Sequence, residues 1–251
     1  MSNTHPAPAP RAARPPRPRA ALTALLALLC LLALQTGGTA NATEASATAE
    51  RAAPTSALAT ADAVPLVAGG DTVYADAGYS CTVVVNLAIG TGHFGLLPGS
   101  CTDSFPHWYA DPQLTTPIGP TVSSQYPTHG LFAYDNPAVP VEQTTSCGGA
   151  PLTTVANPVV GQAVTRSGST TGCLSGTVTG VNVTVNFGGQ VVTGLIATNL
   201  CWEPGFRDGA LTSRTALVGI PVGGSGNCAS GGVSYFQPLA PVLAAYGATI
   251  V

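Results

Sequence analysis

The chain has 251 residues, only 8% of which are charged, and a formal net charge of −3. Its basic residues are all arginine, and four of them lie within the first 19 positions. From Val67 onward three arginines stand against eight acidic residues, a balance of −5. That balance leaves no basic patch and argues against nucleic acid as a partner.

The first 42 residues have the organisation of a secretory signal peptide. Arginines precede an apolar run from Ala20 to Leu34, and the small residues Ala40–Ala42 follow it. The alternative is a membrane anchor, but this run is shorter than the roughly 20 residues that cross a bilayer as a helix. We therefore predict a signal peptide over residues 1–42, a secreted (extracellular) protein, and no stable membrane anchor once the signal is removed.

Residues 43–66 are rich in Ala, Thr and Ser and have no apolar periodicity, which predicts a disordered tail or a short pro-segment. Beyond them, short β-branched or alternating runs are separated by Gly and Pro, as in residues 81–86, 176–187 and 191–198. Only the stretch from Pro238 to Tyr246, followed by Gly247, has the pattern of a helix. The sequence therefore predicts an all-β fold with one short C-terminal helix.

Six cysteines remain after the leader, an even number that predicts a disulfide framework in an exported chain. Sequence alone allows 15 pairings of Cys81, Cys101, Cys147, Cys173, Cys201 and Cys228. A zinc site is the alternative. The chain has no C-x-x-C pair, and its mature histidines lie in unrelated contexts, so we expect no metal and no cofactor.

Several motifs resemble the secreted bacterial chymotrypsin-like serine proteases of the streptogrisin type (peptidase family S1). They are A-V-T-R-S-G-S-T-T-G-C from Ala163, T-N-L-C-W-E-P-G from Thr198, G-G-S-G-N-C from Gly223 and, upstream, G-S-C-T-D-S from Gly99. The resemblance implies two six-stranded antiparallel β-barrels within residues 67–251, one over about 67–150 and one over about 151–251, with the active site between them. It also implies the pairs Cys81–Cys101, Cys147–Cys173 and Cys201–Cys228. We expect a monomer.

The resemblance also locates the catalytic triad, whose three side chains must act together. The family's histidine position falls in the run Leu97–Cys101 and holds Ser100, and the aspartate position holds Thr128. The family's E-P-G-D-S-G-G-P-L aligns without a gap to Glu203–Leu211, which puts Arg207 at the serine. A guanidinium is no nucleophile, and neither hydroxyl replaces the imidazole base or the carboxylate. We therefore predict that the chain is not an enzyme.

A rebuilt site is the competing interpretation. Ser100, His129, Asp135 and Asp208 carry suitable groups, but His129 matches a position just beyond the aspartate, so its side chain should point another way. We expect His129 to be a loop residue. Arg207 either forms an anion pocket beside the backbone N–H of Gly205 or pairs with a neighbouring acid and fills the cleft.

The predicted function is that of a pseudo-protease that binds a peptide, a protein or a protease inhibitor in the former substrate cleft. The expected cleft residues are Gly205, Arg207, Val222, Gly223 and Gly224. An extended peptide could add to this strand through backbone hydrogen bonds, although glycines at 223 and 224 could equally be structural. The alternatives are an active serine endopeptidase with a divergent site and an extracellular structural domain.

Overall fold

The computed structural model describes residues 65–168, 172–203, 205 and 208–251. Predictions that concern the leader, the segment up to residue 64 and Arg207 lie outside the described residues. Among the helices in the described part of the chain, none combines the length and apolar character needed to cross a bilayer.

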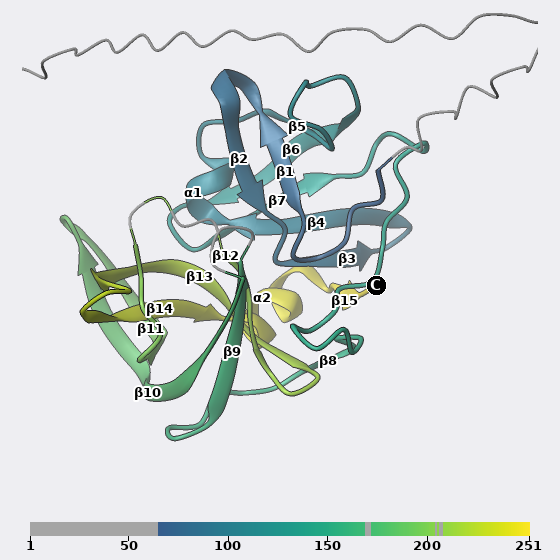
Figure 1. Ribbon diagram of the computed structural model, residues 1–251. Helices are drawn as coiled ribbons and strands as arrows, with labels where there is room; N and C mark the ends of the chain where they lie inside the picture. The colour runs from purple at the N-terminus through teal and green to yellow at the C-terminus, as the bar shows by residue number, and fades with distance from the viewer. Residues whose placement is uncertain (1–64, 169–171, 204, 206–207) are drawn as a thin grey trace, which may run out of the picture. The chain divides into compact units, whose positions relative to one another are not determined.

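The N-terminal half and the last strand of the chain form an eight-stranded sheet in the order β15-β3-β4-β7-β6-β5-β1-β2 (Figure 1). A 3₁₀ turn, Asp76–Gly78, joins its first two strands, and one helical turn, α1 (Gly99–Thr102), follows its fourth. Its strands are β1 (Thr72–Ala75), β2 (Tyr79–Thr82), β3 (Val85–Ile89), β4 (Gly92–Pro98), β5 (His107–Tyr109), β6 (Pro117–Gln125), β7 (His129–Ala133) and β15 (Thr249–Ile250).

The C-terminal half forms a seven-stranded sheet in the order β12-β9-β10-β11-β14-β13-β8. An additional β12–β13 pairing closes this sheet on itself, which produces a barrel. Its strands are β8 (Thr154–Val155), β9 (Ala163–Gly168), β10 (Gly172–Phe187), β11 (Gln190–Thr198), β12 (Asp208–Ser213), β13 (Ala216–Asn227) and β14 (Gly231–Pro238).

The longest hairpin, β10–β11, follows directly from its sequence. Gly188 and Gly189 both have positive φ, 65° and 110°, which a two-residue turn between antiparallel strands requires. Phe187 therefore pairs with Gln190 across the turn. The period-two alternation before the turn and the apolar residues after it become the two arms of the hairpin.

One apolar cluster combines residues from both sheets and from the C-terminal helix α2 (Leu239–Tyr246). It includes Leu87 and Leu96 of the first sheet, and Ile220 of the second sheet, all with no exposed surface. The helix ends at Gly247 in the left-handed conformation, as its sequence predicts. The two sheets are thus packed on common side chains, and the cleft described below opens where they meet.

The three disulfides are Cys81–Cys101, Cys147–Cys173 and Cys201–Cys228, the pairs that the resemblance implies. Each closes a loop of 20 to 27 residues, for which loop-entropy arguments give about 3 kcal/mol of stabilisation. The expected fold class, mostly β with two barrel-like sheets and a short helix, is confirmed. The sheets hold eight and seven strands rather than six because short strands such as β8 and β15 add to their edges.

Candidate functional site

A cleft of about 350 Å³ is the candidate functional site, because both halves of the fold line it. The first sheet and α1 supply one wall, and the second sheet with the segment between β11 and β12 supplies the other. Among the described residues, those that line the cleft are Tyr79, Cys81, Pro98, Ser100 and Cys101 on one side and Trp202, Gly205, Asp208, Pro221 and Val222 on the other.

Ser100 is brought into this cleft by a close backbone approach. It is exposed at the start of α1, and the preceding Gly99 is buried against the turn that leads into β7. A Cβ at Gly99 would lie 2.7 Å from the backbone nitrogen of Thr128, so only glycine fits there. The positions predicted to match the family's histidine and aspartate are therefore carried on adjoining segments.

Thr128 and His129 do not line the cleft. The Thr128 hydroxyl donates to the carbonyl oxygen of Gln125 at 2.9 Å and lies 3.0 Å from Nδ1 of His129. The imidazole packs edge-on against Tyr246 of α2, and burial lowers the pKa of His129, which favours its neutral form. The expectation that His129 is a loop residue is wrong: it begins β7 and pairs with Pro98, because the strand starts directly after the turn.

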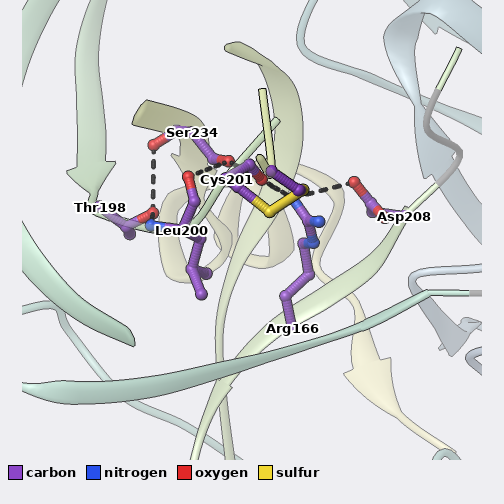
Figure 2. Close-up of polar contacts among 7 residues, drawn as sticks. Arg166, Thr198, Leu200, Cys201, Asp208 and Ser234 are labelled. Carbon is purple, nitrogen blue, oxygen red and sulfur yellow. Dashed lines mark hydrogen bonds and ion pairs between the residues drawn. A yellow bond between two sulfur atoms is a disulfide. The ribbon is translucent and has the colours of Figure 1, made fainter. Parts of the chain in front are cut away.

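A buried ion pair, which the sequence analysis did not predict, lies at the cleft wall. Nη1 of Arg166 is 3.1 Å from Oδ2 of Asp208, and the two side chains are 0% and 1% exposed (Figure 2). The same Nη1 donates to the carbonyl oxygen of Cys201 at 3.1 Å and to the Ser234 hydroxyl at 3.3 Å. The Ser234 hydroxyl in turn lies within hydrogen-bond distance of the carbonyl oxygens of Leu200 and Cys201. This network links β9, β14 and the segment before Trp202.

Within the part of the chain that the structure describes, the Asp208 carboxylate is paired by charge, but neither of its oxygens accepts a hydrogen bond. Burial raises the pKa of Asp208 to about 6, and the neighbouring Arg166 opposes that rise. Burial likewise lowers the pKa of Arg166, which its charge partner counteracts. One sequence feature could have indicated this pair, namely Arg166 within the strand Ala163–Gly168. An arginine in a barrel strand is almost never buried without a partner of opposite charge.

The predicted cleft residues have different environments. Gly205, with φ of 85°, and Val222 line the cleft. Gly223 and Gly224 do not; a Cβ at Gly223 would meet the Phe187 ring at 2.7 Å, and one at Gly224 would overlap Trp202. Because these two positions have no side chain, aromatic rings can pack directly against β13. This supports the interpretation that both glycines have a structural role.

Arg207 lies outside the described residues, so its predicted place in the cleft stays a prediction. Its neighbour Asp208 has Arg166 as its ion-pair partner. Among the described residues, no group of three or more His, Cys, Asp or Glu side chains is placed to hold a metal ion.

Comparison with known proteins defines the class to which this fold and cleft belong. No protein-family model matches the chain. Serine protease 2 of Streptomyces fradiae is 39% identical over 174 residues, 67% of this chain and 100% of that protein. Glutamyl endopeptidase 2 of Streptomyces griseus is 34% identical over 73% of this chain and 99% of its own length. The chain belongs to the streptogrisin-type, chymotrypsin-like serine protease family.

Longer relatives and solved structures agree. Streptogrisin-A and Streptogrisin-D of Streptomyces griseus are 38% and 41% identical, and the chain spans 62% and 48% of their lengths. The solved structure of Alpha-lytic protease homolog N4 is 39% identical with a TM-score of 0.65, over 74% of this chain and 99% of that one. A solved glutamic acid-specific serine protease is 33% identical with a TM-score of 0.66, over 74% and 100%.

These relatives contradict the prediction that the chain is not an enzyme, because the proteins that it matches over their full length are named as proteases. That prediction relied on an ungapped match of Glu203–Leu211 to the family's serine motif. That match puts the motif's aspartate at position 206. The only aspartate of this segment is Asp208, which lies two residues later and begins β12. An ungapped match therefore does not by itself assign the chemistry of the segment.

Proposed function

We propose that this chain is a secreted serine-type endopeptidase with a divergent active site, and that its substrate is an extended peptide held in the cleft. The observation that carries the proposal is the match to named proteases over their whole length, together with a cleft at the junction of the two sheets. Such a junction of two packed halves is a usual place for a binding site.

The edge of β13 suits an extended peptide. Gly223 and Gly224 pair with Tyr235 and Ser234 of β14 on one side. On the other side, the β12 partnership ends at Gly219, so among the described strands none covers the following residues. A peptide can add to such an edge through main-chain hydrogen bonds, with neighbouring pockets selecting its side chains.

Hydrolysis in this cleft would not follow the ordinary triad. We infer that the positions of the family's histidine, aspartate and serine hold Ser100, Thr128 and Arg207. Ser100 is then the candidate nucleophile, because its exposed hydroxyl lines the cleft. We expect slow cleavage, because the positions of the family's base and of its orienting acid hold neither an imidazole nor a carboxylate that could activate Ser100.

A second candidate function is the binding of a peptide, a protein or a protease inhibitor. It is favoured by the uncovered edge of β13, because strand addition uses backbone groups and needs no triad side chain. We further propose that residues 1–42 direct secretion, that residues 43–66 precede the folded part, and that the protein is a monomer without a cofactor.

Cleavage of casein by the purified protein tests the proposal. We expect slow cleavage by the wild type, loss of cleavage in Ser100→Ala and unchanged cleavage in Ser104→Ala. Ser104 is the matched control because it is also exposed and follows the same helical turn, but lies outside the cleft. Cleavage that is absent in the wild type, or equal in both variants, would overturn the proposal.

A further inference from the structure

A second groove, of about 710 Å³, lies on the C-terminal barrel and shares no described lining residue with the cleft. Its polar side chains are those of Gln162, Thr165, Ser175, Ser213 and Arg214. They belong to β9, β10, the end of β12 and the residues beside them. The other described lining residues are alanine, valine or glycine, so small side chains leave the space that the polar groups border.

Arg214 is the one exposed arginine in the part of the chain that the structure describes. The chain has no lysine, and the other described arginine, Arg166, is buried in its ion pair with Asp208. Within the described ranges, the Arg214 guanidinium forms neither an ion pair nor a hydrogen bond. Its N–H donors are therefore available to a ligand in the groove.

The backbone of Arg214 is in the left-handed region, with φ of 55°. Ser213 pairs with Ala216, so Arg214 is the first of the two residues that turn β12 into β13. A positive φ at this place in a hairpin favours glycine, and any other residue there is strained. Because the turn itself favours glycine, the benefit of an arginine must come from its side chain, and strained residues of this kind are concentrated at functional sites.

The remaining polar groups of the groove also have unused hydrogen-bonding capacity. Oε1 of Gln162 accepts a hydrogen bond from the backbone N–H of Val159 at 2.9 Å, which fixes the carboxamide and leaves Nε2 without a described partner. Thr165 and Ser175 are opposite each other on β9 and β10, which places their Cβ atoms about 5 Å apart. The Ser213 hydroxyl donates to a backbone carbonyl oxygen at 2.9 Å and keeps its acceptor sites.

This set of groups suits a ligand that carries one carboxylate and several hydroxyls. A guanidinium and a carboxamide donate to a carboxylate, and protein hydroxyls both donate to and accept from hydroxyls of a ligand. A peptide fits less well, because β9 already pairs with β10 and β12 and cannot add a further strand. The described lining also holds no aromatic ring on which a peptide side chain could anchor.

We propose that this groove binds a sugar acid, with Arg214 holding the carboxylate and the hydroxyls of Thr165 and Ser175 contacting those of the sugar ring. The carboxylate belongs either to a free sugar acid or to a uronate unit of a polysaccharide, and the test below includes both sources. The inference is independent of the proposed endopeptidase activity, since the groove and the cleft have separate linings.

Titrations followed by NMR spectra of the ¹⁵N-labelled protein test the inference, at pH 7.5 and low ionic strength so that the single charge is not screened. The ligands are glucuronate, its neutral amide, acetate and trigalacturonate. We expect glucuronate to bind at least about 5-fold more tightly than its amide or acetate, since the amide lacks the charge and acetate lacks the ring. Tighter binding of trigalacturonate would identify a polysaccharide as the source, and weaker binding a free acid.

Three variants locate the contact. Arg214→Gln should reduce the preference for glucuronate over its amide to less than about 2-fold. Gln143→Glu changes the net charge by the same amount at an exposed position outside the groove, and it should leave the preference unchanged. Arg214→Gly should lose the preference as well, yet melt at or above the temperature of the wild type, because glycine suits the positive φ of this turn.

Three results would overturn the inference. The first is equal binding of glucuronate and its amide by the wild type, or no binding of glucuronate at millimolar concentrations, whatever the variants do. The second is an equal loss of preference in Arg214→Gln and Gln143→Glu, because net charge alone would then explain it. The third is a melting temperature of Arg214→Gly below that of the wild type, because the arginine would then stabilise the turn itself. Cleavage of casein, or its absence, changes none of these outcomes.

Discussion

Lowering the pH from 7 to 5 should stabilise the folded chain through Asp208. The pKa of this carboxyl is about 6 in the folded protein and 3.8 in the unfolded chain, because burial disfavours its charged form. The folded state therefore binds the proton more readily. The stabilisation that protonation of Asp208 gives is complete below the unfolded pKa of 3.8, and it is lost as the pH rises through the folded pKa of about 6.

The magnitude follows from the difference between the two pKa values. About two units, at 1.36 kcal/mol each, give on the order of 3 kcal/mol over the whole window. Between pH 7 and pH 5 the same linkage gives about 1 kcal/mol, because Asp208 is then mostly protonated in the folded state and still ionised in the unfolded one. His129 contributes with the opposite sign, since its lowered pKa disfavours protonation in the folded state.

Urea denaturation at pH 5, 6 and 7, followed by the fluorescence of the buried Trp108, measures this dependence. Asp208→Asn cannot titrate at this position but keeps His129, so the difference between the two proteins isolates Asp208. We expect the wild type to gain about 1 kcal/mol of unfolding free energy relative to the variant between pH 7 and pH 5. Parallel pH profiles for the two proteins would refute the reasoning.

Two further predictions concern packing and the disulfides. Gly224→Ala should destabilise the protein by about 1–3 kcal/mol and weaken peptide binding, because the added Cβ would overlap Trp202 and displace it from the cleft wall. Thermal unfolding measures the first effect, with Gly148→Ala as a control, because a Cβ there would meet only Oγ of Ser146 at an ordinary contact distance of 3.9 Å. Equal melting temperatures of the two variants would contradict the prediction. Replacing Cys81 and Cys101 together by alanine should lower the free energy of unfolding in denaturant by about 2–4 kcal/mol. An unchanged denaturation midpoint would show that this bridge does not restrict the conformational freedom of the unfolded chain.

Much of the fold could be predicted from local sequence signals. The alternation up to Phe187 and the glycine pair after it specify a hairpin, because side-chain period and turn conformation are local properties. The helix that ends at Gly247 has equally local signals. The disulfide pairing was different: sequence alone left 15 possibilities, and only the family resemblance selected the three pairs that the structure contains.

The candidate site was less predictable because it depends on contacts between distant residues. Arg166 and Asp208 are 42 positions apart, and nothing near either residue shows that the fold brings them within 3.1 Å. The roles of Gly223 and Gly224 likewise depend on the rings of Phe187 and Trp202, which approach from other segments. Sequence motifs located the cleft, but the charges and aromatic walls inside it became apparent only from the folded chain.

Mapping of a fluorophosphonate adduct by mass spectrometry tests the central claim most directly, because this probe bonds covalently to a serine that acts as a nucleophile. The account predicts one adduct on the peptide that carries Ser100, with labelling lost in Ser100→Ala and kept in Ser104→Ala. A protein that stays unlabelled under conditions in which a related protease is labelled completely, or an adduct on a serine outside the cleft, would contradict it.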